Sequence, residues 1–164
     1  MTTARRVVDD LRSRGATVAT GESLTGGLVC AALVDVPGAS DVVRGGIVAY
    51  QAELKTSLLG VPAELIAERG TVDPDVAAAL ARGARSRCGA TYGVGTTGVA
   101  GPGPSEGKPQ GAVFVAVVGP DDRAQIEELT LDGDRAEVRR GAVAAALSAL
   151  AGRLRREESG AGTR

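Results

Sequence analysis

Short runs of small apolar residues alternate along the chain with segments of helical periodicity, and this alternation restricts the fold more than any other feature. Strands are predicted at 16–20, 46–50, 91–96, 112–118 and 124–131, and helices at 1–15, 24–34, 51–59, 74–88 and from residue 134 onward. Helices that alternate with strands cover both faces of one sheet. The last two strands flank the turn 119–122 as a hairpin. We therefore expect an α/β fold: a three-layer α/β/α sandwich with a mixed, mostly parallel sheet of about five strands.

Local signals at the helix ends support these boundaries. Asp73 followed by Pro74 is typical of an N-cap with proline in the first turn, and Asp134 is expected to cap the last helix. Gly60 and Gly89 stand where helices end. The chain contains no internal repeat or linker, so residues 1–156 are predicted to form a single domain. The polar segment 157–164 is expected to be a disordered tail.

The composition excludes several catalytic mechanisms. The 164 residues include no His, which rules out a Ser-His-Asp triad, a Cys-His pair and His-containing zinc sites. Cys30 and Cys88 are not spaced as a zinc ribbon or a redox pair, so we interpret both as buried thiols in a reducing compartment. A disulfide between them is the less favoured alternative. Only two of the 19 basic residues are lysines, Lys55 and Lys108.

Charge and hydropathy indicate a cytoplasmic protein without general affinity for nucleic acid or membranes. Residues 1–15 mix charged and apolar side chains and lack the apolar core of a signal peptide. The longest uncharged apolar stretches fall short of the ~20 residues that cross a bilayer. A net charge of −1 provides no general attraction to nucleic acid or to an anionic membrane. The sequence is compatible with a homodimer but assigns no interface.

Three segments at the predicted carboxyl ends of strands, 21–27, 50–55 and 96–102, are candidates for a site, because ligands of such folds bind there. In the first, Ser23 could be a nucleophile, with backbone N–H groups of Thr25, Gly26 and Gly27 in the first turn of a helix to bind an oxyanion. The alternative is an ordinary serine N-cap. The segment is not a phosphate-binding P-loop, because Gly27 stands where that motif requires Lys.

The second and third segments offer a base and a binding loop. Lys55 could act as a general base if burial lowered its pKa by about 3 units, and Tyr50 could relay a proton. The alternatives are a solvated lysine and a core tyrosine. In 96–102, hydroxyl and glycine residues could bind a phosphate or a carboxamide, or form a plain surface loop. Arg135 or Arg139 could bind a phosphate, although helix capping and surface ion pairs explain them equally well.

Taken together, five ordered motifs resemble the CinA C-terminal domain family, which includes nicotinamide mononucleotide deamidases. The resemblance covers residues 7–154, and its motifs are E-S-L-T-G-G at 22–27, Y-x-x-E-x-K at 50–55, T-G-V-A-G-P at 97–102, K-P-x-G at 108–111 and G-D-R-x-x-V-R at 133–139. Two residues depart from the family pattern. Leu24 replaces a frequent Cys, and Ala52 replaces a frequent Asn that would offer a polar contact near Lys55.

The resemblance implies an amidohydrolase that converts nicotinamide mononucleotide to nicotinate mononucleotide and ammonia, without metal or other cofactor. It implies Ser23 as nucleophile and Lys55 as base, assisted by Tyr50 and Thr97. The substrate-binding residues it implies are Glu22, Thr25, Gly26, Gly27, Gly98, Ala100, Gly101 and, as a phosphate ligand, Arg139. The alternative function is a non-catalytic nucleotide-binding or competence-associated interaction module of the same fold, which the Ala52 departure favours.

Overall fold

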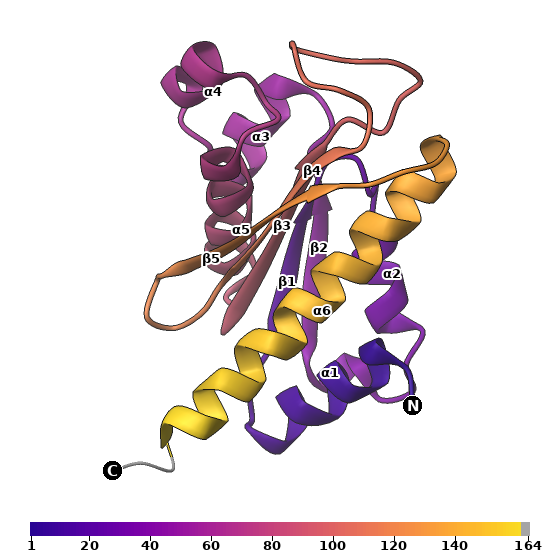
Figure 1. Cartoon of the computed structure of the whole chain (residues 1–164). Helices are drawn as coiled ribbons and strands as arrows, with labels where there is room; N and C mark the ends of the chain where they lie inside the picture. Colours follow the sequence, from indigo (N-terminus) through magenta and orange to yellow (C-terminus); the bar gives the residue numbers. More distant parts are fainter. Residues whose placement is uncertain (162–164) are drawn as a thin grey trace.

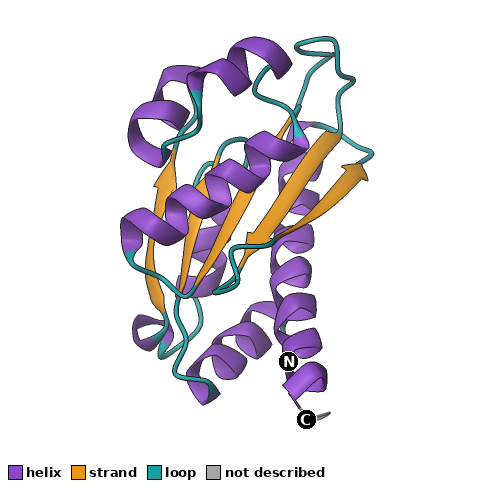
Figure 2. Ribbon diagram, turned by 90° about the vertical axis from the view of Figure 1, so that its left-hand side faces the viewer, coloured by secondary structure: helices purple, strands orange, loops and turns teal. Residues whose placement is uncertain are grey.

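The computed structural model describes residues 1–161, in which helices cover both faces of a five-stranded sheet (Figures 1 and 2). The strands are β1 (Val18–Glu22), β2 (Val43–Val48), β3 (Tyr92–Gly98), β4 (Ala112–Val118) and β5 (Ala124–Thr130). The helices are α1 (Thr3–Ser13), α2 (Leu28–Val34), α3 (Ala52–Leu59), α4 (Ala63–Arg69), α5 (Pro74–Cys88) and α6 (Arg135–Ala161), with a 3₁₀ turn, η1, at Ala39–Asp41. No helix within these residues combines the length and apolar character needed to cross a membrane.

The strand order in the sheet is β2-β1-β3-β4-β5. Strand β1 pairs in parallel with both β2 and β3, whereas β4 is antiparallel to β3 and β5 is antiparallel to β4. Only β4 therefore runs against the other strands. This arrangement confirms the predicted mixed, mostly parallel sheet and the three-layer α/β/α fold.

Each face of the sheet carries its own hydrophobic core. Helices α1, α2 and α6 bury their apolar residues against one face, and α5 packs with α3 on the other. The α5 side depends on glycines in β3, because a Cβ atom built on Gly93 would lie 1.9 Å from the carbonyl oxygen of Ala81 in α5. Glycine at this position lets the helix backbone approach the strand closely.

Gly93→Ala is accordingly expected to lower the free energy of unfolding by about 3 kcal/mol, because the added methyl group meets rigid helix backbone. Urea denaturation measures the change. Gly152→Ala in α6 is the matched control: its Cβ would come no closer than 3.4 Å to another atom, and that atom is the end of the Arg156 side chain. Alanine should leave stability unchanged or raise it there. Equal effects at the two positions would contradict this view of the α5–β3 packing.

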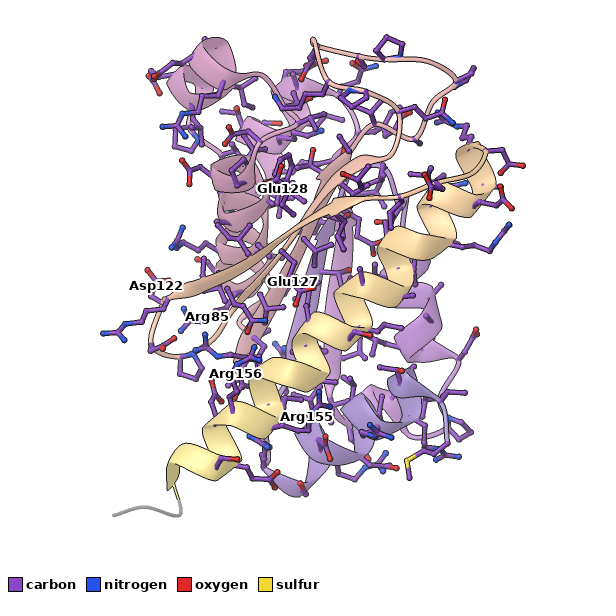
Figure 3. The ribbon with its side chains drawn as sticks, in the orientation of Figure 1. Arg85, Asp122, Glu127, Glu128, Arg155 and Arg156 are labelled. Carbon is purple, nitrogen blue, oxygen red and sulfur yellow. The ribbon has the colours of Figure 1, made fainter. Side chains whose placement is uncertain are left out.

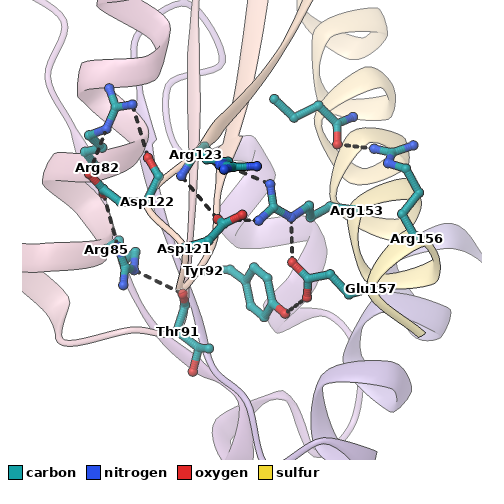
Figure 4. Close-up of polar contacts among 11 residues, drawn as sticks. Arg82, Arg85, Thr91, Tyr92, Asp121, Asp122, Arg123, Arg153, Arg156 and Glu157 are labelled. Carbon is teal, nitrogen blue, oxygen red and sulfur yellow. Dashed lines mark hydrogen bonds and ion pairs between the residues drawn. The ribbon is translucent and has the colours of Figure 1, made fainter. Parts of the chain in front are cut away.

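The hairpin between β4 and β5 is bound to helices on both faces of the sheet at the edge away from β2 (Figures 3 and 4). Asp121 accepts a hydrogen bond from Arg153 of α6 at 2.5 Å, and Asp122 pairs with Arg85 of α5 at 3.3 Å. Arg153 also binds Glu157 at 2.6 Å, and Glu157 accepts a hydrogen bond from the hydroxyl of Tyr92.

These contacts explain why the expected disordered tail is wrong for residues 157–161, which continue α6. Glu157 stands four residues after Arg153, a spacing that stabilises a helix, and the same carboxylate binds Tyr92 of β3. Residues 162–164 of the predicted tail lie outside the described part of the chain.

Other boundaries differ from expectation near the strand ends. Helix α2 begins at Leu28 instead of residue 24, because Gly26 and Gly27 have φ values of 58° and 97°, which an α-helix does not accommodate. Strand β1 extends to Glu22, β3 extends to Gly98, and β2 ends at Val48. Helix α4 was not predicted. The N-cap at Asp73 and the helix ends at Gly60 and Gly89 are confirmed.

Candidate active site

The three candidate segments meet at the carboxyl ends of β1, β2 and β3. Glu22 at the end of β1 lies opposite both Val48 of β2 and Thr96 of β3. The residues that follow these positions therefore surround one point at the edge of the sheet. A pocket of about 250 Å³ opens there, lined by Ser23, Leu24, Tyr50, Thr71, Val72, residues 98–105 and Arg135.

Lys55 lies beneath this pocket and is 1% exposed. Its Nζ atom lies 3.0 Å from Ser23 Oγ, 2.8 Å from the carbonyl oxygen of Ala49 and 2.9 Å from that of Tyr50. The alternative of a solvated lysine is therefore wrong. Because these acceptors come from Ser23 and from the main chain, this arrangement of Lys55 does not depend on a polar side chain at position 52.

The three contacts suit a base that acts on Ser23. A protonated Nζ has three hydrogens, which match the two carbonyl oxygens and Ser23 Oγ. After loss of one proton, the amine can still donate to both carbonyls and directs its lone pair at the Ser23 hydroxyl. The geometry thus allows Lys55 to accept the proton that Ser23 loses as it attacks.

Burial lowers the pKa of Lys55 from 10.5 to about 8, and the negative charges of Glu106 and Glu53 oppose the decrease. A substantial fraction of Lys55 is therefore neutral at mildly alkaline pH. A base must be unprotonated to act, so a pKa near working pH suits the role that sequence analysis gave to this residue.

Ser23 stands on a tight turn after β1, where 8% of it is exposed. Its N–H group donates to the carbonyl oxygen of Thr96 at 3.1 Å, and its own carbonyl oxygen accepts from Gly26 at 3.0 Å. These bonds fix the turn on both sides of the hydroxyl. The prediction that 25–27 form the first turn of a helix is wrong, since α2 begins later and the N–H of Gly26 is bound within the turn.

Glu22 is fully buried and its carboxylate stabilises the start of α2, while its predicted role in binding substrate stays a prediction. Its carboxylate accepts hydrogen bonds from the N–H groups of Val29 and Cys30 and from the hydroxyls of Thr20 and Thr25, at 2.7–3.0 Å. A carboxylate can satisfy four donors in this way. Thr25 is also fully buried, and its hydroxyl binds Glu22 beneath the turn.

Tyr50 and Thr97 occupy the site but direct their hydroxyls to other partners. The Tyr50 hydroxyl accepts a hydrogen bond from Arg135 at 3.0 Å, while its carbonyl oxygen holds Lys55. Thr97 is buried and donates to the carbonyl oxygen of Thr71 at 2.7 Å. The assisting roles predicted for these two hydroxyls stay predictions.

The two candidate phosphate ligands, Arg135 and Arg139, occupy different positions relative to the pocket. Arg139 donates to the carbonyl oxygens of Leu24 and Thr25, at 2.9 and 3.3 Å, and so supports the Ser23 turn from behind. Arg135 lines the pocket, where it donates to the carbonyl oxygen of Gly101 at 2.6 Å. Gly98, Ala100 and Gly101 line the pocket as well, whereas Gly26, Gly27 and Arg139 are not among its lining residues.

Sequence reasoning missed the wall formed by Thr71 and Val72, which precede α5. No motif includes them, and they reach the site only because the chain between α4 and α5 passes over the end of β3. Glu106 was also missed, although its carboxylate binds this wall. Within residues 1–161, no group of three or more His, Cys, Asp or Glu side chains is arranged to hold a metal ion.

Comparison with known proteins places this geometry in a family. The sequence profile of the CinA C-terminal domain matches residues 1–154. A CinA-like protein of Frankia casuarinae is 52% identical over 137 residues, which cover 84% of this chain and 31% of that protein. The chain thus spans about a third of the length of the curated relatives it matches.

Solved structures agree in fold over nearly their whole length. The competence/damage inducible protein CihA from Agrobacterium tumefaciens has a TM-score of 0.86 and 38% identity, covering 90% of this chain and 91% of the other. A competence-damaged protein (CinA) superfamily protein from Klebsiella pneumoniae has a TM-score of 0.90 and 30% identity, with coverage of 94% and 96%.

Proposed function

The chain belongs to the CinA C-terminal domain family, and we propose that it is an amidohydrolase that converts nicotinamide mononucleotide to nicotinate mononucleotide and ammonia. The observation that carries this proposal is the hydrogen bond of 3.0 Å between the buried amine of Lys55 and the hydroxyl of Ser23 at the base of a pocket. A nucleophile paired with a base of lowered pKa is an arrangement that supports attack on an amide carbonyl.

In the first half of the reaction, neutral Lys55 takes the proton of the Ser23 hydroxyl as Oγ attacks the carboxamide carbon. The carbon becomes tetrahedral and its oxygen gains a negative charge. Protonated Lys55 then gives its proton to the amide nitrogen, the C–N bond breaks, and ammonia leaves. The nicotinoyl group is now an ester of Ser23, and Lys55 is again neutral.

In the second half, a water molecule takes the place that ammonia vacated. Lys55 removes a proton from this water as its oxygen attacks the ester carbon, and returns the proton to Ser23 Oγ as the ester bond breaks. The products are the carboxylic acid and the free serine. The same two side chains serve both halves, and both end the cycle in the protonation state in which they began it.

The substrate class that fits the pocket is an anionic carboxamide. Arg135 is the one cationic side chain among the lining residues, and its guanidinium is held by the carbonyl oxygen of Gly101 and the hydroxyl of Tyr50. A guanidinium fixed by two contacts keeps further N–H groups for a phosphate. Arg135 therefore replaces Arg139 as the proposed ligand of the substrate's phosphate.

Arg135→Ala is expected to raise KM for nicotinamide mononucleotide by at least about tenfold, because a charge-assisted phosphate contact is worth about 1.5–3 kcal/mol. Initial rates of ammonia release at varied nucleotide concentration measure the change. Arg140→Ala is the matched control, since Arg140 is an exposed arginine of α6 that does not line the pocket. Equal KM values for Arg135→Ala and Arg140→Ala would remove Arg135 from the binding site.

The proposed function is tested by comparing kcat/KM for ammonia release from nicotinamide mononucleotide, free nicotinamide and glutamine. We expect the nucleotide to be preferred, because only it offers both a phosphate and an aromatic carboxamide. Equal values for all three compounds would refute a nucleotide-specific site. A preference for glutamine would place the activity in another class of amidase.

A further inference from the structure

Glu106 makes an unusual set of contacts for a residue at the tip of an exposed loop. The loop 99–111 connects β3 to β4 and arches over the end of the sheet beside α4 (Figure 1). The carboxylate of Glu106 accepts hydrogen bonds from the N–H of Thr71 at 2.8 Å, from the N–H of Val72 at 3.2 Å and from the Thr71 hydroxyl at 3.0 Å. Each partner belongs to the pocket wall opposite this loop.

The segment 70–72, which binds the Glu106 carboxylate, leaves room for it at Gly70. Gly70 has a φ of 77°, and a Cβ atom there would lie 2.7 Å from Glu106 Oε2. On the other side, the carbonyl oxygen of Thr71 accepts the hydroxyl of Thr97. Thr71 is thus held between the end of β3 and the loop, and the wall it forms depends on both bonds.

The loop side of the contact is also constrained. Glu106 has a φ of 52°, in the left-handed region that non-glycine residues rarely occupy, and Gly107 follows with a φ of 75°. Ser105 and Lys108 exchange two backbone hydrogen bonds across them, which closes a tight turn. Asn, Asp or Gly is favoured at the position of Glu106 in such a turn, so the backbone alone does not account for a glutamate there.

We propose that Glu106 is a positioning residue of the candidate active site, whose carboxylate fixes the Thr71–Val72 wall of the pocket. This inference rests on the proposed function only for its kinetic readout. The charges that act on Lys55 are Glu106 from the loop and Glu53 from its own helix, and the guanidinium of Arg135 and the Tyr50 hydroxyl face the same pocket.

The ionisation of Glu106 follows from its surroundings. Desolvation alone would raise its pKa, but hydrogen bonds from Thr71 and Val72 outweigh this effect and hold the pKa below its usual value. The carboxylate is therefore charged at neutral and alkaline pH. Its charge favours protonated Lys55, which limits how far burial lowers the pKa of that lysine.

Two variants separate the wall contact from the charge. Glu106→Asp keeps the charge but shortens the side chain by one methylene, which withdraws the carboxylate from Thr71 and Val72. Glu106→Gln keeps the length and an acceptor oxygen but removes the charge. Glu53→Gln is the matched control for charge, because Glu53 also acts on Lys55 but is not among the residues that line the pocket.

The first readout is the pKa of Lys55 from the pH dependence of its ¹³Cε NMR signal in lysine-labelled protein. The chain has only two lysines, so Lys108→Arg assigns both signals. We expect a midpoint near 8 in the wild type, a lower midpoint in Glu106→Gln and in Glu53→Gln, and a midpoint in Glu106→Asp close to the wild type.

The second readout is the rate of hydrogen exchange in the Thr71–Val72 wall. Hydrogen exchange of a peptide that contains Thr71 and Val72 should accelerate at least about tenfold in Glu106→Asp and stay near the wild-type rate in Glu53→Gln. KM for nicotinamide mononucleotide should rise about tenfold in Glu106→Asp, whereas Glu106→Gln should mainly move the rise of kcat/KM to lower pH. Wild-type exchange of the Thr71–Val72 peptide in Glu106→Asp would overturn the proposal.

The two physical readouts do not require turnover, so the two proposals can fail separately. If the wild type releases no ammonia from the nucleotide while exchange and titration change as expected, the proposed substrate is wrong and the role of Glu106 stands. If ammonia is released but exchange of the Thr71–Val72 peptide does not respond to Glu106→Asp, the role of Glu106 is refuted and the proposed function stands.

Discussion

Ser23→Ala should lower kcat for ammonia release from nicotinamide mononucleotide by about 10⁴-fold or more, because the variant lacks the atom that forms the acyl ester. The change removes one oxygen and keeps the backbone hydrogen bond from residue 23 to Thr96. The fold and the binding pocket should therefore persist, and nucleotide affinity measured by calorimetry should change by less than about tenfold.

Ser57→Ala is the control for this experiment. Ser57 is an exposed serine on α3, two residues beyond Lys55, and it is not among the residues that line the pocket. Wild-type turnover is expected from it. If Ser23→Ala released ammonia within about tenfold of the wild-type rate, Ser23 would not be the nucleophile, and attack by a water molecule directly on the substrate would replace the acyl-enzyme route.

Lys55→Met and Lys55→Arg should each lower kcat by about 10³-fold or more. Methionine has similar length but no basic nitrogen, and arginine keeps its proton throughout the accessible pH range. In the wild type, kcat/KM should rise with pH and level off above a midpoint near 8, because only neutral Lys55 accepts the Ser23 proton. Initial rates between pH 6 and pH 10 measure this profile in all three proteins.

The same lowered pKa gives Lys55 an effect on stability. Its folded pKa of about 8 lies below the unfolded value of 10.5, so the unfolded chain binds more protons between these limits. The contribution of Lys55 to stability is therefore full above pH 10.5 and decreases as the pH falls to 8. Urea unfolding should show this decrease in the wild type and not in Lys55→Met.

A Lys55→Met enzyme that retained the wild-type dependence of kcat/KM on pH would contradict the assignment of Lys55 as the base.

Much of the fold could be predicted because its signals are local. Asp73 with Pro74, and the glycines Gly60 and Gly89, mark helix ends through capping chemistry that acts within one turn. Strand ends in a parallel sheet meet at one edge, so Ser23 and Lys55 could be expected in one site from their places after two strands. The distance of 3.0 Å between them fits that expectation.

What the sequence did not reveal depends on contacts between distant parts of the chain. The carboxylate of Glu22 resembled a binding residue because it lies in a motif, but its partners are the N–H groups of α2 beneath the turn. Arg135 binds the hydroxyl of Tyr50, which lies 85 positions earlier, and Glu106 binds Thr71 across 35 positions. Periodicity and capping patterns carry no information on such pairs.

The fate of the nucleotide itself tests hydrolysis by Ser23 most directly. Wild-type protein and Ser23→Ala are incubated with nicotinamide mononucleotide near pH 8.5, and nucleotide and ammonia are quantified together. We predict that the wild type produces one ammonia for each nicotinate mononucleotide formed and that Ser23→Ala leaves the substrate intact. A nucleotide that stays unchanged with the wild type, or is converted equally by both proteins, would refute Ser23-dependent hydrolysis of nicotinamide mononucleotide.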